Sequence, residues 1–193
     1  MSPPVLILAS ASPRRRQLLA ELGLAFDTVT APVVENEDPS TDPRVMVAYN
    51  ASIKADWVAS RNPIAWVLGA DTTVYLEGCA LNKPRDAAEA RAMLRRLSGR
   101  THTVFTGIAL RNILHNVRID EGVASEVTFH TLDEAQIEAY LARVHTLDKA
   151  GGYAIQEHSE LIVAGYTGSL SNIIGLPVEE TKRLLTRCGL LPA

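Results

Sequence analysis

Apolar runs and helical patterns alternate along the first half of the chain. The apolar run at 5–8 predicts a buried strand that passes directly into a helix. Ser12 suits the N-cap of that helix, Pro13 its first position, and Gly23 the residue past its end. The elements predicted for this half are strands at 5–8, 25–30 and 64–76, a turn at 77–78, and helices at 13–22, 43–60 and 87–97.

The helix predicted at 43–60 begins with a second pair of N-cap residue and proline, Asp42 with Pro43. Its apolar positions follow helical spacing, and they predict a buried stripe formed by Val45, Met46, Tyr49, Ile53 and Trp57. Lys54 lies beside this stripe, so its ammonium group either flanks a cleft or extends to solvent.

The second half contains a predicted strand pair, a helix and several short elements. The clean alternation before residue 130 favours an antiparallel, half-exposed strand. Two capping boxes are predicted, Asp86 with Glu89 and Thr131 with Glu134. The predicted elements are strands at 101–110 and up to 130, a helix at 132–144, a glycine-containing loop at 149–156 that runs into a strand, a buried strand at 161–163, a flexible polar segment at 168–172, and a last helix from 175 to about 188.

Strand–helix units combined with one hairpin predict a mixed sheet flanked by helices. The 193 residues contain no repeat, low-complexity tract or long linker, so a single domain spanning 1–193 is expected. A net charge of −3 argues against nucleic-acid binding, which normally needs a basic surface. No apolar run approaches the ~20 residues of a membrane span, and the first residues do not resemble a signal peptide. With two cysteines far apart, a cytoplasmic protein with free thiols is expected.

The first helix begins with three arginines, at 14–16. Positive charge is unfavourable there, because the free N–H groups already make that end of a helix positive. A bound phosphate would compensate for this charge. The alternative is that the arginines are simply solvated and that only the cap matters.

A single carboxylate, Asp71, interrupts the apolar run at 64–76. A carboxylate in such a run is costly unless it is paired, binds a metal or faces a cleft. Glu35 and Glu37, in an acidic loop at a strand end, are further candidates for metal ligation. Cations together with carboxylates are typical of a polyphosphate site with a hard divalent metal. The chain has neither GxxxxGK[ST] nor GxGxxG, and its histidines lack metal-binding spacing.

Several short motifs together resemble those of the Maf family, in order and spacing, from about residue 5 to 188. They are SASPRR at 10–15, GADT at 69–72, KP at 83–84, LSG at 97–99 with His102 and with TG at 106–107, KAGGYAIQ at 149–156, and SN at 171–172 before GLP at 175–177. The resemblance implies an elongated α/β fold related to the inosine-triphosphate pyrophosphatases. In that fold, a twisted mixed sheet forms two lobes around a central nucleotide cleft.

The resemblance also implies a metal-dependent nucleoside triphosphate pyrophosphatase of the cytoplasm. Asp71 matches the catalytic position of the family, and Mg²⁺ or Mn²⁺ would be held by Asp71 and Glu35. The matching substrate-binding positions are Ser10, Arg14, Arg15, Lys54 and Lys83. The expected partner is a small-molecule nucleotide, with no nucleic acid and no membrane, and a homodimer is possible.

Three positions separate the branches of the family by substrate. Arg14, Thr72 and Gln156 match the branch that acts on dTTP and UTP, whereas the branch acting on 7-methyl-GTP carries SPWR, GSDQ and a glutamate. The chain departs from the pattern at Glu157-His158, after the glutamine, and at Val34, before Glu35. Two alternatives stay open: a non-catalytic nucleotide-binding regulator of septum formation, and a house-cleaning enzyme for modified or purine nucleotides.

Overall fold

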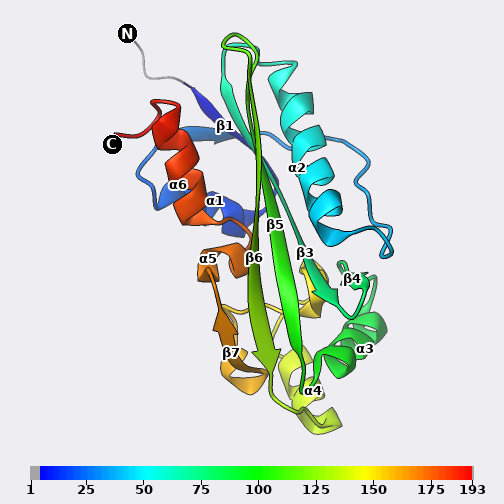
Figure 1. The fold of residues 1–193 in the computed structure, drawn as a ribbon. Coiled ribbons are helices and arrows are strands. Elements are labelled where there is room, and N and C mark those ends of the chain that lie inside the picture. The colour runs from blue at the N-terminus through cyan, green and yellow to red at the C-terminus, as the bar shows by residue number, and fades with distance from the viewer. Residues whose placement is uncertain (1–4, 193) are drawn as a thin grey trace.

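A seven-stranded mixed sheet forms the centre of the computed structural model, which describes residues 5–192 (Figure 1). The strand order is β2-β1-β3-β5-β6-β7, with β4 paired to β3. β1 runs parallel to β2 and β3, and the other pairs are antiparallel. The strands are β1 (Leu6–Ala9), β2 (Phe26–Thr28), β3 (Trp66–Leu76), β4 (Cys79–Leu81), β5 (Thr101–Asn112), β6 (Val117–Phe129) and β7 (Val163–Thr167).

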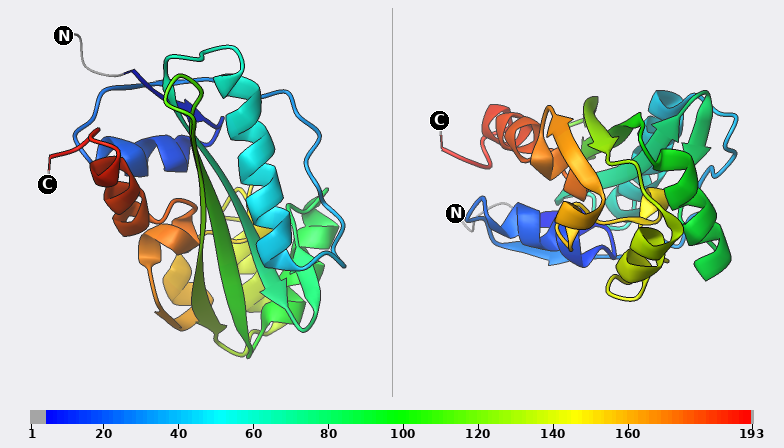
Figure 2. Two further views of the ribbon diagram at one scale, coloured as in Figure 1. Left: turned by 45° about the horizontal axis from the view of Figure 1, so that its top comes forward. Right: turned by 90° about the horizontal axis from the view of Figure 1, so that it is seen from below.

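Helices cover both faces of the sheet. They are α1 (Pro13–Ala20), α2 (Pro43–Ala59), α3 (Ala87–Leu97), α4 (Glu134–Leu141), α5 (Leu170–Ile174) and α6 (Val178–Arg187), with 3-10 turns η1 (Ala150–Gly152) and η2 (Ser159–Leu161). α2 lies on one face, and α1 and α6 lie together on the other (Figure 2). The predicted mixed sheet flanked by helices is therefore confirmed. Within 5–192, no helix combines the length and apolar character that a membrane crossing requires.

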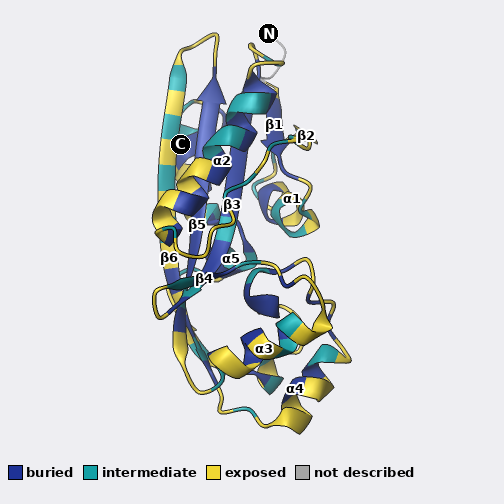
Figure 3. Ribbon diagram, turned by 90° about the vertical axis from the view of Figure 1, so that its right-hand side faces the viewer, coloured by how far each residue is buried: buried dark blue, intermediate teal, exposed yellow. Residues whose placement is uncertain are grey.

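The hydrophobic core is divided along the length of the long strands. Alternate residues of β1 and β3 face opposite sides, so Leu8 and Leu68 pack with α1 and α6, whereas Ile7 and Val67 pack with α2. A separate cluster fills the other end of the sheet, where α3 and α4 pack near Val74 and the ends of β5 and β6. Figure 3 shows β1, β3 and β5 as largely buried, whereas β6 alternates between intermediate and exposed residues along its first half.

Helix α2 is seated directly on the backbone of the sheet. A Cβ atom at Gly69 would lie 2.3 Å from the carbonyl oxygen of Ala51, and one at Gly107 would lie 2.6 Å from that of Val47. The two glycines lie on neighbouring strands, β3 and β5, so the helix crosses both without intervening side chains. This close approach fixes the height of every α2 side chain above the sheet.

The predicted apolar stripe of α2 is only partly correct. Val45 and Tyr49 are exposed, and the buried face is instead centred on small residues such as Ala51 and Ala55. The reason is the glycine seat, because a helix that touches the sheet backbone cannot place large side chains between the two. The same face carries two buried polar residues, Asn50 and Lys54.

Several predictions for the second half are wrong in detail. The expected strand after residue 152 is absent, because positive φ angles at Gly151 and Gly152 curl the chain into a 3-10 turn. Only Ile162 of the expected strand at 161–163 is fully buried, and the actual strand β7 is an edge strand paired to β6. The segment expected to be flexible at 168–172 instead contains α5, which Ser169 caps.

The capping predictions need correction as well. α4 is capped by Asp133, with Gln136 completing the capping box, while Thr131 lies two residues outside that cap. Asp86 does cap α3, but the Glu89 carboxylate accepts from the backbone N–H of Arg85 instead of closing a box. The remaining helices begin or end a few residues inside their predicted limits; α6, for example, starts at Val178 after Pro177.

The contact of α2 with the sheet backbone predicts that two glycines paired across β5 and β6 differ in how much stability an alanine substitution costs. Gly107→Ala is expected to lower the free energy of unfolding by about 1–3 kcal/mol, because the added methyl group meets helix backbone that cannot yield. Gly122→Ala is the control, since its Cβ meets nothing nearer than 4.0 Å. Urea unfolding of both variants measures the difference. Equal stabilities would contradict the close contact between α2 and the backbone of β5.

Candidate active site

One cleft of about 340 Å³ is lined by all nine residues that the family resemblance predicts for the site. Its walls come from the end of β1, the first turn of α1, the loop before α2, α2 itself, β3, the loop after β4, and the segment after η1. The predicted residues that line it are Ser10, Arg14, Arg15, Glu35, Lys54, Asp71, Thr72, Lys83 and Gln156. The structure thus brings together residues separated by as many as 146 positions in the chain.

Lys54 forms the centre of the polar wall. Its Nζ donates to Oε2 of Glu35 at 2.6 Å and to Oδ1 of Asp71 at 2.8 Å. The Lys54 and Asp71 side chains are only 11% and 12% exposed, so this is a largely desolvated ion pair. Of the two sequence-based alternatives for Lys54, flanking a cleft is correct. The Asp71 carboxylate is paired with Lys54, which offsets the free-energy cost of burying a charge within an apolar strand.

Asn50 is a site residue that the sequence analysis missed. Its Nδ2 donates to Oδ2 of Asp71 at 3.0 Å and to the carbonyl of Asn36, and its Oδ1 accepts from the Asn36 N–H at 2.7 Å. One buried amide therefore holds both the carboxylate and the loop that carries Glu35. Asn50 precedes Lys54 by one helical turn, and this spacing was the available signal.

Arg15 lies inside the cleft wall instead of in solvent. Its guanidinium donates to the carbonyl of Gly175 at 2.8 Å, to the hydroxyl of Thr72 at 3.0 Å, and to that of Ser10 at 3.4 Å. Burial lowers the pKa of Arg15, while the charges of Asp71 and Glu35 act in the opposite direction. Arg15 remains a cation at neutral pH, held in one orientation at the start of α1.

Arg14 crosses the mouth of the cleft to a segment far along the chain. It donates to Oδ2 of Asp148 at 3.0 Å, and the buried Lys149 donates to Oδ1 of the same carboxylate at 2.9 Å. Burial alone would raise the pKa of Asp148, but hydrogen bonds from Lys149 and Arg14 hold it below its ordinary value. Asp148 is a second residue that the sequence analysis missed.

The far end of the cleft is apolar, with Gln156 at its edge. Five side chains form this lining: Val74, Val104, Tyr153, Ile155 and Ile173. Gln156 is exposed in a turn and does not follow a strand, which corrects the expected local structure. Of the two unusual residues after it, Glu157 lies 3.5 Å from Lys149. Lys83 is exposed on the rim, and Val34 is 91% exposed.

Two carboxylates of the cleft are the groups that would hold a divalent cation. Within the described chain, no three His, Cys, Asp or Glu side chains gather as a metal site. Glu37 does not line the cleft, which leaves Glu35 and Asp71. Two carboxylates supplemented by phosphate oxygens are a common environment for Mg²⁺, which rarely uses a cage made only of protein.

A mixed α/β protein whose cleft combines several cations with three carboxylates belongs among proteins that bind phosphorylated ligands. The chain is a member of the Maf family, since residues 5–188 match the model described as "Maf-like protein". The resemblance inferred from the motifs is thereby confirmed.

Curated relatives match almost the whole chain. A protein of Akkermansia muciniphila is 46% identical over 98% of both chains, and one of Myxococcus xanthus is 49% identical over 96% of this chain and 93% of its own. Both are named dTTP/UTP pyrophosphatase. Among solved structures, a HAM1 protein from Coxiella burnetii aligns over 95% of this chain and 99% of its own, with a TM-score of 0.56 and 17% identity. This likeness supports the fold.

The ion pair predicts a specific pattern of stabilities. Lys54→Met is expected to lower the free energy of unfolding by about 3 kcal/mol, because it leaves two carboxylates close together without their cation. Adding Asp71→Asn to the same chain is expected to restore part of this loss. Lys182→Met, on the exposed side of α6, is the control and should have little effect. A double variant less stable than Lys54→Met alone would contradict the charge argument.

Proposed function

We propose that this protein hydrolyses dTTP and UTP between the α- and β-phosphates, releasing the nucleoside monophosphate and pyrophosphate. Relatives that are 46–49% identical over nearly the whole chain carry this name. The observation that carries the proposal is the convergence of all nine predicted residues on one cleft, with Lys54 bonded to both carboxylates. The cleft has a charged end and an apolar end, as a nucleotide does.

The charged end suits the triphosphate. Arg14, Arg15, Lys54 and Lys83 neutralise charge on the phosphate oxygens, which lowers the free energy of a transition state that gathers negative charge there. Ser10 lies beside Arg15 and supplies a hydroxyl donor. The Arg14–Asp148 pair is partly exposed, so a phosphate can replace the carboxylate as the partner of Arg14.

Asp71 is the proposed general base. Lys54 and Asn50 occupy one oxygen each, and they hold the carboxylate in one plane while leaving further lone pairs free to accept a proton from water. Asp71 and Glu35 are also the residues that would hold Mg²⁺ or Mn²⁺. Such a cation lowers the pKa of a bound water and screens phosphate charge.

The apolar end of the cleft suits the pyrimidine ring of the nucleotide, and Gln156 is the residue proposed to recognise it. The Watson–Crick edge of uracil or thymine offers a carbonyl and an N–H, and a glutamine amide can pair with both in one plane. Thr72 bonds Arg15 and Thr106, at 3.0 and 2.9 Å, so it links this end to the phosphate cations. Together with Arg14, these residues make up the proposed specificity set.

The regulator hypothesis differs in what it requires of the cleft. A binding module needs the cations, but it has little need for a carboxylate fixed by two partners as Asp71 is. That geometry favours the enzyme. A panel of about a dozen triphosphates, with Mg²⁺ and Mn²⁺, separates this proposal from a house-cleaning role with modified or purine nucleotides. The homodimer, the cytoplasmic location and the single two-lobed domain stay predictions.

The proposed reaction predicts a large loss on removing the base. Asp71→Asn is expected to reduce kcat for UTP by at least ~10²-fold, because the amide cannot accept a proton from water. Release of pyrophosphate and UMP is measured directly. Asp27→Asn, on the exposed part of β2, is the matched control and should keep full activity.

Either of two results would count against this mechanism: full activity of Asp71→Asn, or products that are diphosphate and phosphate. No pyrophosphate from any nucleotide, alongside micromolar binding, would instead support the regulator.

The proposed base reading predicts a change in selectivity. Gln156→Glu is expected to lower kcat/KM for UTP and dTTP relative to 7-methyl-GTP, because a carboxylate cannot donate to the base carbonyl. Gln136→Glu is the matched control, since a glutamate keeps the capping box of α4. Unchanged ratios for Gln156→Glu would show that this residue does not read the base.

A further inference from the structure

Residues 153–156 line the proposed base end of the cleft, yet they have no regular secondary structure. This segment follows two glycines with positive φ and ends in the turn that carries Gln156. A segment of this kind usually owes its conformation to contacts outside its own backbone. The contacts of this segment come from α4 and from the core cluster that α3 and α4 form at one end of the sheet.

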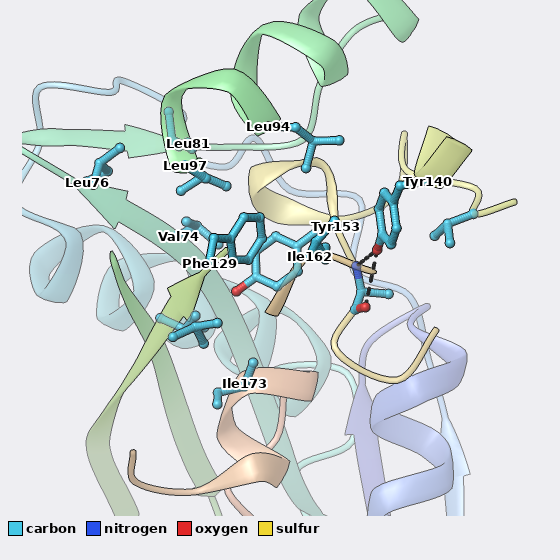
Figure 4. Close-up of a cluster of buried hydrophobic side chains, with 14 of the residues drawn as sticks. Val74, Leu76, Leu81, Leu94, Leu97, Phe129, Tyr140, Tyr153, Ile162 and Ile173 are labelled. Carbon is cyan, nitrogen blue, oxygen red and sulfur yellow. Dashed lines mark hydrogen bonds between the residues drawn. The ribbon is translucent and has the colours of Figure 1, made fainter. Parts of the chain in front are cut away.

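The Tyr140 side chain of α4 is hydrogen-bonded to both backbone polar groups of Ala154 in this segment. Its hydroxyl accepts from the N–H of Ala154 at 2.9 Å and donates to the carbonyl of Ala154 at 3.2 Å (Figure 4). Tyr140 is fully buried, and burial raises its pKa to about 12. The hydroxyl therefore keeps its proton at neutral pH, which it needs in order to donate and accept together.

Two neighbouring contacts extend the same support. The hydroxyl of Tyr153 is hydrogen-bonded to Nε2 of the buried His102 at 2.7 Å. The N–H of Gly151 donates to the carbonyl of Asn82, and Gly151 packs so closely on Val74 that a Cβ atom would lie 3.0 Å from it. Ala154 is the last residue before Gln156 whose backbone is hydrogen-bonded to a side chain of another element, so the Tyr140 bonds determine where the turn begins.

We infer that Tyr140 is a positioning residue for base selection. It fixes the backbone from which the Gln156 side chain reaches the base. The inference rests on the proposed reading of the base by Gln156. Tyr140 is buried on the side of the segment away from the cleft, and it affects Gln156 through Ala154. It does not belong to the phosphate end, where Asp71 and Lys54 lie.

The substitution Tyr140→Phe tests this role while keeping the ring in place. It removes the partner of the Ala154 N–H and one of two partners of the Ala154 carbonyl, which also accepts from the Glu157 N–H at 3.4 Å. The segment therefore relaxes, and Gln156 loses its fixed origin. The ratio of kcat/KM for UTP to that for 7-methyl-GTP is expected to fall about tenfold or more, chiefly through KM for UTP. A ratio unchanged from the wild type would overturn the inference.

The chain offers a closely matched control at Ser98. Its hydroxyl also bonds both backbone groups of one residue, Leu132, accepting at 2.7 Å and donating at 3.4 Å, at the connection before α4. Ser98→Ala thus removes the same kind of double bond in the same part of the molecule, away from the cleft. It is expected to lower the melting temperature without changing the substrate ratio. A ratio that falls equally in both variants would reduce Tyr140 to a structural role.

Hydrogen exchange of the wild-type protein provides a test that does not depend on the folding of any variant. The Ala154 amide is expected to exchange far more slowly than those of the exposed residues 156 and 158, because a buried hydroxyl accepts from it. Exchange at Ala154 as fast as at 156 and 158 would overturn the inference that Tyr140 fixes this backbone.

A double variant separates this inference from the proposed function. Gln156→Ala alone is expected to lower the substrate ratio, and Tyr140→Phe added to it should lower the ratio no further, since both act through one side chain. An additive second loss would overturn the inference and leave base reading by Gln156 intact. An unchanged ratio in Gln156→Ala would overturn both.

Discussion

The contact between α2 and the sheet is the constraint on which the site depends. Two glycines, Gly69 and Gly107, bring the helix down to the backbone of β3 and β5. At that height, Asn50 and Lys54 reach Asp71 at hydrogen-bond distance, two residues along β3 from Gly69. A larger residue at either glycine would lift the helix and separate the amide and ammonium groups from the carboxylate.

The charged end of the cleft is held together by pairs of opposite charges. Lys54 is bonded to Glu35 and Asp71, and Arg14 to Asp148, so the cations proposed to bind phosphate already have carboxylate partners. These partners keep the cations from repelling one another and hold them in place. The partly exposed Arg14–Asp148 pair exchanges its partner most readily, whereas the pair of Lys54 and Asp71 is largely desolvated.

Much of the fold and nearly all of the site follow from the sequence, because motifs preserve residue identities at fixed positions. Ser12 and Pro13 identify the start of α1, and the glycine before Asp71 identifies the site strand. The burial of α2 could be predicted only in part from hydrophobicity, since contact with two glycines places small residues at the centre of the buried face and leaves Val45 and Tyr49 exposed. Asn50 and Asp148 were missed because their roles depend on partners distant in sequence.

The two ends of the cleft share continuous strands, and this limits how the molecule can move. β3 carries Asp71 at the polar end and Val74 at the apolar end, with a separation along the strand of about 10 Å. β5 runs beside it without interruption. A hinge between the two ends is therefore absent from these strands, and the cleft can change its width but not its length. Under the proposed function, the length of this strand segment sets the distance between the base and the bond to be broken.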